Sequence, residues 1–390
     1  MIFPDYEGGS LVNLMRSLGD ACGARAPLPY APLRDTKVSL RDTARNIVLL
    51  VIDGLGFHYL QRHGAGGHLH RHLRARLTSV FPSTTASAVT TLLSGLAPQQ
   101  HALTGWHMYF SELDAIAAVL PLRPRGAGAF DAPPGTRSRR LVGHAPFSDR
   151  IPRRSVFISP QAIAQSEFNL YHSGRAIVRG YRTLAELFEQ TNTAIRESGE
   201  PLYIHAYYSE LDALTHLHGV GSPQVAAQFA ALDEAFGTFL AAIAGSDTMV
   251  IACADHGFID SPPGRQIDLA QHPDLAATLA RPLCGERRVA YCYLKPGQTP
   301  RFEDYVAEHF GHCMEAFPSR TLVEQGWFGP GAADPRLASR IGDFVLVMRE
   351  DWTLLDWVEG EKRHRQLGVH AGVSADEMFV PLVVAHCGQS

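Results

Sequence analysis

The chain has 390 residues, 45% of them hydrophobic and 19% charged, so it can bury a large core and is not an intrinsically disordered chain. Its formal net charge of −4 argues against a generally basic surface for a nucleic-acid polymer or an anionic membrane. No apolar run is long enough to span a bilayer, the first residues lack the pattern of a signal peptide, and the six cysteines form no CxxC pair. We therefore expect a cytoplasmic protein with free, buried thiols and no membrane association.

The first strong element is a strand over residues 46–52, which follows a short amphipathic helix expected over residues 11–18. The strand is a continuous run of β-branched and leucine residues, which is typical of a strand buried on both faces in a parallel sheet. It ends at Asp53-Gly54. Such a pair on its own is most often a turn, but ligands of open α/β sheets bind at the carboxyl ends of strands, where Asp53 could hold a metal.

A hydroxyl-rich segment follows, in which Thr84 and Thr85 open a helix of small residues that ends at Gly95. Serine and threonine cap helices routinely, and that is the simpler interpretation of the two threonines. The first turn of a helix also has free N–H groups and the positive end of the helix dipole. A phosphoryl group held against Thr84 or Thr85 would be stabilised there.

The middle of the chain combines an arginine-rich irregular stretch with a second acidic strand end. Residues 121–154 are rich in Pro, Gly and Arg and are expected to form a loop or lid, and residues 175–199 to be helical. A strand over residues 201–208 leads to Asp212 and His216, which are four residues apart. If this piece is helical, both side chains lie on one face and can reach one metal ion.

A third buried strand, residues 248–254, ends in Asp255-His256, and a lone His370 precedes a last strand that begins at Phe379. Strand, helix and strand signals between these two points suggest a smaller inserted unit. We expect an α/β fold with a doubly wound, mostly parallel sheet and helices on both faces. Residues 1–262 and 366–390 would form the core, and residues 263–365 an α+β cap.

The candidate ligands are more informative as a set than singly. Oxygen and imidazole ligands without thiolate suit Zn²⁺, with Mn²⁺ also plausible, and this many ligands predict two metal sites beside a hydroxyl group. The predicted ligands are Asp53, Asp212, His216, Asp255, His256 and His370, together with Thr85.

In this combination and order, the motifs resemble those of the alkaline-phosphatase superfamily, and among its branches the type I phosphodiesterases and nucleotide pyrophosphatases. They extend over residues 47–384. The matches are Asp53-Gly54 after the first strand, Thr85 ten residues before Gly95, Glu-x-Asp-x-x-x-His-x-x-Gly at Glu210 to Gly219, Asp-His-Gly at Asp255 to Gly257, and His370-Ala371-Gly372 before Asp376-Glu377-Met378.

The resemblance implies a hydrolase of phosphate esters with two zinc ions and a covalent phospho-threonine intermediate. One metal would be held by Asp53, Asp255 and His256 beside the nucleophile, and the other by Asp212, His216 and His370 beside the leaving group. The spacing to Gly95 favours Thr85 over Thr84 as the nucleophile.

Small phosphate esters or nucleotides are the expected substrates, and the oligomeric state is not predicted. A phosphomonoesterase or a phosphonate hydrolase could use the same metal site. A metal-holding binding protein without activity is a more remote alternative, because such a protein has no need of a nucleophile.

Overall fold

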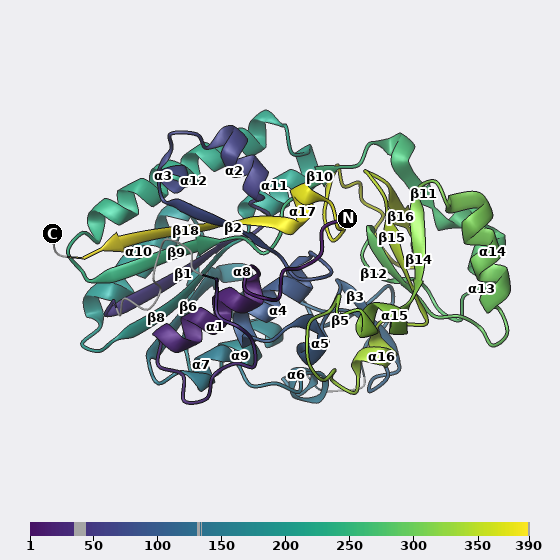
Figure 1. The fold of residues 1–390 in the computed structure, drawn as a ribbon, viewed down its shortest axis with the longest axis horizontal. Helices are drawn as coiled ribbons and strands as arrows, with labels where there is room; N and C mark the ends of the chain where they lie inside the picture. Colours follow the sequence, from purple (N-terminus) through teal and green to yellow (C-terminus); the bar gives the residue numbers. More distant parts are fainter. Residues whose placement is uncertain (35–43, 131–132, 134, 389–390) are drawn as a thin grey trace.

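A computed structural model gives the structure of the chain and describes residues 1–34, 44–130, 133 and 135–388 (Figure 1). Its larger sheet has seven strands in the order β2-β18-β9-β1-β8-β6-β7. The strands are β1 (Asn46–Ile52), β2 (Leu73–Thr78), β6 (Arg154–Pro160), β7 (Ile177–Tyr181), β8 (Leu202–Tyr208), β9 (Thr248–Cys253) and β18 (Phe379–Cys387). Only β18 runs antiparallel to its neighbours, so the predicted mostly parallel sheet is confirmed.

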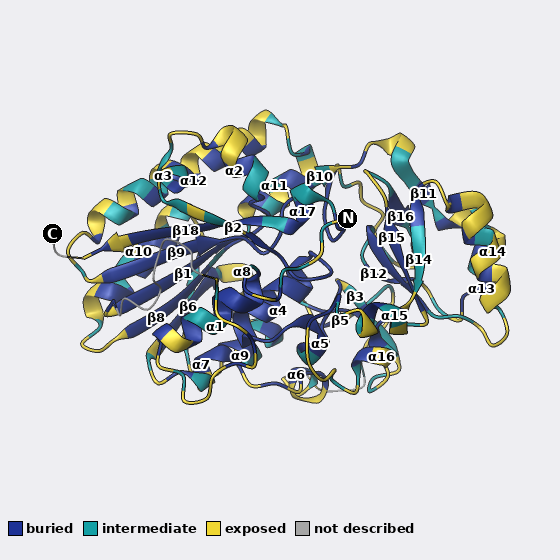
Figure 2. Ribbon diagram, viewed as in Figure 1, coloured by how far each residue is buried: buried dark blue, intermediate teal, exposed yellow. Residues whose placement is uncertain are grey.

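Helices cover both faces of this central sheet (Figure 1). One face carries α1 (Leu11–Ala21), α4 (Thr85–Ser94), α7 (Phe147–Arg150) and α9 (Glu167–Ser173). The other carries α2 (Phe57–His63), α3 (His68–Arg71), α10 (Leu184–Glu197), α11 (Glu210–His218) and α12 (Pro223–Ala242). Every residue of β1 and of β9 is buried, as expected for strands between two helix layers (Figure 2).

A second sheet, all antiparallel, has seven strands in the order β14-β15-β13-β12-β3-β4-β5. The strands are β3 (His107–Phe110), β4 (Ala115–Ala118), β5 (Arg123–Pro124), β12 (Cys284–Gly285), β13 (Val289–Cys292), β14 (Met314–Pro318) and β15 (Phe344–Met348). β3 pairs with β12, so residues 107–124 join the sheet of the predicted insertion 263–365, although they lie far from it in the sequence. The exact division into a core and a cap stays a prediction.

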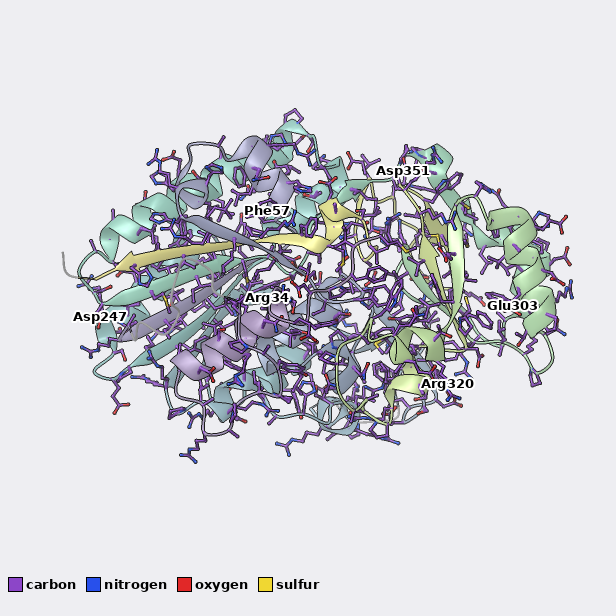
Figure 3. All side chains as sticks on the ribbon, in the orientation of Figure 1. Arg34, Phe57, Asp247, Glu303, Arg320 and Asp351 are labelled. Atoms are coloured by element: carbon purple, nitrogen blue, oxygen red, sulfur yellow. The ribbon has the colours of Figure 1, made fainter. Side chains whose placement is uncertain are left out.

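The second sheet has its own helices and apolar clusters. The helices are α13 (Pro273–Thr278), α14 (Thr299–Phe310), α15 (Ser319–Glu324) and α16 (Leu337–Arg340). Buried Phe302 and Phe310 of α14 pack in one cluster, and Phe81 and Phe328 pack in another. Charged side chains on the outer helices, such as Glu303 and Arg320, point away from the sheets (Figure 3).

The short elements complete the chain. The remaining helices are α5 (Pro98–His101), α6 (Arg137–Leu141), α8 (Gln161–Ala164) and α17 (Ala375–Met378), and 3₁₀ turns cover Pro263–Arg265 and Leu269–Gln271. Two small two-stranded sheets pair β10 (Ile259–Asp260) with β17 (Gly368–Val369) and β11 (Gln266–Asp268) with β16 (Thr353–Leu355).

The structure changes two local predictions. The helix expected over residues 175–199 is two elements, because Ile177 and Val178 pair with β6 as an edge strand before α10 begins. β-branched residues that find a partner strand favour the extended conformation. The predicted lid over residues 121–154 contains positions 131, 132 and 134, which lie outside the described residues; its described part holds β5, α6 and α7.

All six cysteines are buried and free, as predicted. Within the described residues, none of the helices is both long enough and apolar enough to cross a bilayer. The cytoplasmic location stays a prediction.

Candidate metal-dependent active site

Three neighbouring parallel strands bring the acidic residues together. In the sheet, β1 lies between β8 and β9 and runs parallel to both. Their carboxyl ends therefore meet at one edge, where Asp53 follows β1, Asp255 follows β9, and α11 begins directly after β8. Gly54 has φ +77°, and a Cβ there would lie 2.4 Å from the Phe258 ring, so the turn after Asp53 requires glycine.

One group of side chains consists of Asp53, Asp255 and His256, all buried. Each offers one ligand atom, and these atoms lie within 4.8 Å of one another. His256 Nε2 is 3.4 Å from Asp53 Oδ1 and 3.3 Å from Asp255 Oδ2. Backbone N–H groups of Gly54 and His256 donate to the other oxygen of Asp255, and the Tyr207 hydroxyl donates to the other oxygen of Asp53. Each carboxylate is thus held by one oxygen and presents the other to the site.

A second group consists of Asp212, His216 and His370. Asp212 and His216 lie on one face of α11, as their spacing predicted, with His216 Nε2 3.5 Å from Asp212 Oδ1. His370 follows β17, and its Nε2 is 4.0 Å from the same oxygen. The rings of His370 and His256 stack with centroids 3.7 Å apart, so the two groups are in contact.

The backbone orients all three imidazoles in the same way. Nδ1 of His216, His256 and His370 lies 2.8, 3.1 and 3.3 Å from the carbonyl oxygens of Gly368, Gly257 and Ser83 respectively. If Nδ1 carries the proton and donates it to the carbonyl, Nε2 keeps a free lone pair that points at the site. Ligating histidines are commonly held by such an outer hydrogen bond.

Three buried carboxylate oxygens of the site are free to coordinate metal ions. Asp53 Oδ1, Asp212 Oδ1 and Asp255 Oδ2 have no hydrogen-bond partner among the described residues. Buried carboxylates of this kind are normally paired or coordinate metals. A further cluster of His68, Asp233 and Glu234 differs, because the Asp233 oxygens already accept the N–H groups of His68 and Leu69.

Electrostatics lead to the same conclusion. Burial, and then the neighbouring carboxylates of Asp212 and Asp255, raise the pKa of Asp53 well above its usual range. Burial, and then Asp255, raise the pKa of Asp212 to about 7, although His256 opposes the shift. Burial lowers the pKa of His216 to about 4 and that of His370 well below its ordinary value. His216 and His370 are thus neutral, as ligands must be, and cations held between the carboxylates would favour their ionised form.

Thr85, not Thr84, faces this cluster. Thr85 is the first residue of α4, and its Oγ1 lies 3.1 Å from His256 Nε2. Thr84 is the residue before the helix, and its hydroxyl donates to Glu286 Oε1 at 2.5 Å. The helix ends at Gly95 with φ +76°, as the sequence predicted. The first N–H groups of α4 have no intrahelical partner, so they are available to an anion beside Thr85.

One turn of the second sheet reaches the site, and its residues were not among the predicted site residues. Between β12 and β13, Glu286 accepts hydrogen bonds from the Thr84 hydroxyl and the Trp106 N–H. Arg288, 1% exposed, forms a bidentate ion pair with Glu377, with both N–O distances 2.8 Å. Glu377 in turn accepts the N–H of Gly372, which fixes the loop that carries His370. Three consecutive charged residues beside an apolar strand were the available signal.

The loop that carries His370 includes a strained residue. Ala371 has φ +92°, a conformation that favours glycine. It pairs with Ser83 across an isolated bridge, and Ser83 Oγ donates to Gly372 O at 2.7 Å. The segment before the threonines thus holds His370 in place through the backbone.

Two cavities meet at Thr85. The first, of about 310 Å³, extends toward the second sheet and is lined by Asp212, His216 and His370 together with Arg125 and Arg287. The second, of about 700 Å³, extends along the central sheet and is lined by Asp53 and by apolar side chains such as Val89 and Phe168. Both cavities are lined by Thr85, Trp106 and Asp212.

Two arginines of the predicted lid, Arg123 and Arg125, line these cavities. Arg153 of the same stretch does not, because it donates to the backbone oxygens of Ala21, Ala44 and Arg45. The guanidinium groups of the first cavity come from Arg125 and from Arg287, which lies outside the predicted lid.

Comparison with solved structures identifies the fold. Murine ectonucleotide pyrophosphatase/phosphodiesterase 5 matches with a TM-score of 0.65 at 18% identity, over 86% of this chain and 87% of that one. An inactive variant of that protein in complex with AMP gives a TM-score of 0.66 at 18% identity, over 87% and 88%. Phosphonoacetate hydrolase from Sinorhizobium meliloti 1021 gives 0.63 at 16% identity, over 86% and 89%. The fold is that of the alkaline-phosphatase superfamily.

The sequence itself defines the family more closely. The model of the family type I phosphodiesterase/nucleotide pyrophosphatase matches residues 47–372. No curated protein sequence matches the chain significantly. The chain belongs to the type I phosphodiesterase/nucleotide pyrophosphatase family and is a phosphoric ester hydrolase.

Proposed function

We propose that the protein is a dinuclear-zinc phosphodiesterase or nucleotide pyrophosphatase that acts through a phospho-threonine intermediate. One observation carries the choice of a diester: two cavities meet at Thr85. A diester has two organic groups on phosphorus, and each would have a cavity of its own. A monoester would leave one of the two cavities empty.

The residues present suit two metal ions. Asp53, Asp255 and His256 would hold one, and Asp212, His216 and His370 the other. Oxygen and imidazole ligands favour Zn²⁺, with Mn²⁺ as the alternative. When bound, the ions would supply the positive charge that favours the ionised forms of the attacking and departing oxygens.

The chain's own groups account for the remaining chemistry. Thr85 Oγ1 loses its proton and attacks phosphorus, a new P–O bond forms, and the bond to the leaving oxygen breaks, so the leaving group departs as an alcohol that has gained one proton in exchange. The free N–H groups of the first turn of α4 donate to the non-bridging oxygens. Water then attacks the phospho-threonine and releases the phosphate monoester, which restores the Thr85 hydroxyl. Ser83 and Glu377 keep the loop of His370 in place throughout.

The test compares Thr85→Ala with Thr84→Ala on bis(p-nitrophenyl) phosphate after reconstitution with Zn²⁺. We expect Thr85→Ala to lose at least about a thousandfold in kcat, because it removes the attacking oxygen, while its circular dichroism and metal content match those of the unchanged protein. Thr84→Ala keeps the nucleophile and should lose far less.

Three results would contradict the proposal. Thr84→Ala could be the inactive variant, which would place the nucleophile one residue earlier. The unchanged protein could prefer p-nitrophenyl phosphate to the diester, which would indicate a monoesterase. Elemental analysis after reconstitution could return fewer than two metals per chain.

A further inference from the structure

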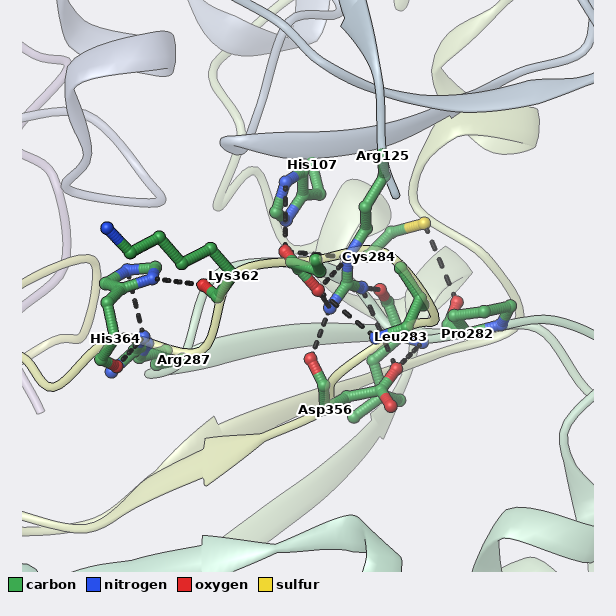
Figure 4. Close-up of polar contacts among 11 residues, drawn as sticks. His107, Arg125, Pro282, Leu283, Cys284, Arg287, Asp356, Lys362 and His364 are labelled. Atoms are coloured by element: carbon green, nitrogen blue, oxygen red, sulfur yellow. Dashed lines mark hydrogen bonds and ion pairs between the residues drawn. The ribbon is translucent and has the colours of Figure 1, made fainter. Parts of the chain in front are cut away.

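The first cavity contains two arginines whose surroundings differ (Figure 4). The Arg125 side chain is 6% exposed and is paired with two carboxylates. Its Nη2 lies 3.1 Å from Glu361 Oε2, its Nη1 lies 3.7 Å from Asp356 Oδ2, and Nη1 also donates to Leu283 O. The charge of Arg125 is therefore compensated within the protein, and this arginine holds the cavity wall together.

Arg287 has no such compensation. Its Nη2 donates to His364 Nε2 at 3.2 Å and to His364 O at 3.3 Å, and its guanidinium carbon lies 5.3 Å from the centre of the Trp357 ring. Among the described residues, no carboxylate oxygen lies within 4.0 Å of it. Burial lowers the pKa of Arg287 to about 10, so the group is charged at neutral pH.

His364 fixes the orientation of this guanidinium. Its Nδ1 lies 3.2 Å from the backbone oxygen of Lys362, so Nδ1 donates there and Nε2 accepts from Arg287. Nε and Nη1 of Arg287 have no hydrogen bond within the described part of the chain. A guanidinium with unused donors is suited to bind a carboxylate or phosphoryl group with two parallel hydrogen bonds.

The acidic residues of the same cavity do not cancel this charge at close range. Asp356 and Glu361 face Arg125. Glu286 accepts from the Thr84 hydroxyl at 2.5 Å and the Trp106 N–H at 2.8 Å. Glu286 and Glu361 therefore attract Arg287 only at longer range, and Arg287 is the arginine of the cavity that has no carboxylate partner within 4.0 Å among the described residues.

The position of the cavity indicates which part of the substrate meets Arg287. The cavity is lined by Asp212, His216 and His370, whereas Thr85 Oγ1 lies beside His256 of the other group. An in-line displacement places the leaving group opposite the attacking oxygen. The leaving group therefore departs past the second group of ligands and into the cavity of Arg287.

We propose that Arg287 is a specificity-determining residue that binds an anionic substituent, a carboxylate or a phosphoryl group, on the leaving group. The proposal rests on the proposed phosphodiesterase function. It predicts that substrates with a negative charge on the leaving group are preferred over neutral ones of the same size.

The test uses matched esters of thymidine 5′-phosphate. The 4-carboxyphenyl and 4-carbamoylphenyl esters differ in charge but hardly in shape, and a 4-phosphonophenyl ester supplies the phosphoryl arm. In Arg287→Gln we expect the kcat/KM ratio of carboxylate to carboxamide ester to fall about tenfold or more, while the carboxamide ester loses less than about threefold. Arg287→Lys keeps the charge without the paired donors and should recover part of the ratio.

Arg365→Gln is the control, because Arg365 is exposed, lies next to His364, and does not line the cavity. It tests whether any loss of positive charge in this region changes the ratio. Calorimetry on Thr85→Ala protein adds a readout that needs no turnover: 4-hydroxybenzoate should bind about tenfold more weakly after Arg287→Gln and unchanged after Arg365→Gln.

The proposal would be overturned if Arg287→Gln left the kcat/KM of both anionic esters unchanged relative to the carboxamide ester, or if Arg365→Gln lowered these ratios equally. If Arg287→Gln lowers kcat/KM only for the phosphonophenyl ester, the result supports the proposal and restricts the anion to a phosphoryl group. Failure of the proposed function looks different, since no thymidine ester would then be cleaved by the unchanged protein in a Thr85-dependent manner.

Discussion

The central sheet and the second sheet both reach the site, but they supply different groups. The carboxyl edge of the central sheet provides the six candidate ligands and Thr85, directly or through α11 and the loop of His370. The second sheet provides Glu286, Arg287 and Arg288 from one turn, and each of them contacts a different partner. Under the proposed function, the central sheet carries out bond breaking and the second sheet selects the leaving group, so variants in each should fail in different ways.

The largest effect is expected in the central sheet. If His370 holds the leaving-group metal, as proposed, His370→Ala removes one of its ligands, so turnover of esters with poor leaving groups should fall by orders of magnitude. A good leaving group such as p-nitrophenolate stabilises its own charge and should suffer much less. Rates for a series of aryl and alkyl esters, with metal content measured in parallel, test this.

Asp255→Ala is the matched control for His370→Ala, because Asp255 belongs to the other candidate ligand group, which would hold the metal beside Thr85. We expect it to slow good and poor leaving groups about equally. Equal losses for both kinds of ester in the His370 variant would show that the roles of the two ligand groups are reversed or that the two groups act as one.

An intermediate effect is expected where the two regions join. Arg288→Met leaves Glu377 buried and without its ion-pair partner, and breaking a buried pair in this way typically costs about 3–5 kcal/mol of stability. Denaturant unfolding, with hydrolysis of the diester measured in parallel, checks this. Arg301→Met removes an exposed pair with Asp274 and should change stability by less than about 1 kcal/mol. Similar losses of stability in the two variants would show that the buried Arg288–Glu377 pair contributes no more than an exposed pair.

The smallest effect is a pH dependence of stability due to Glu286. Burial raises its pKa from 4.5 to about 7, although hydrogen bonds from Thr84 and Trp106 oppose the shift. Between these values the folded chain keeps a proton that the unfolded chain has released, so stability falls as pH rises from about 4.5 to about 7. The slope for one proton is at most about 1.4 kcal/mol per pH unit, and we expect a fraction of this because Glu286 keeps some contact with solvent.

Glu286→Gln should remove this contribution. Urea unfolding of the metal-free unchanged protein and of the variant at several pH values gives the difference directly, with the titrations of Asp53 and Asp212 common to both. Identical pH profiles, or a variant whose stability falls more steeply than that of the unchanged protein, would contradict the assignment.

The site residues that could be predicted from the sequence are those whose local pattern alone indicates their place in the fold. Asp53 and Asp255 follow apolar runs, and a strand buried on both faces can be recognised from such a run alone. Asp212 and His216 are related by helical spacing, and Gly95 marks the end of α4. Parallel pairing of β1 with β8 and β9 then brings these positions to one edge without further information.

Elements and residues could not be predicted where their structural partners are distant in the sequence and their own sequence pattern is weak. The edge strand β7 was predicted as helix, since its conformation depends on β6. Glu286, Arg287 and Arg288 occupy a short turn whose contacts lie 202, 77 and 89 residues away in the chain. Nothing in the turn itself identifies Thr84, His364 or Glu377 as the partners.

That turn also constrains when the enzyme can first become active during its synthesis. Thr84 and Asp53 leave the ribosome well before Glu286, which follows 202 residues after Thr84, and Glu377 emerges later still. Chains fold from the N-terminus as they emerge, at about 5–20 residues per second. A nascent chain therefore spends many seconds with Thr84 and Thr85 made but Glu286 still missing, and the proposed activity can begin only after Glu377 has emerged as well.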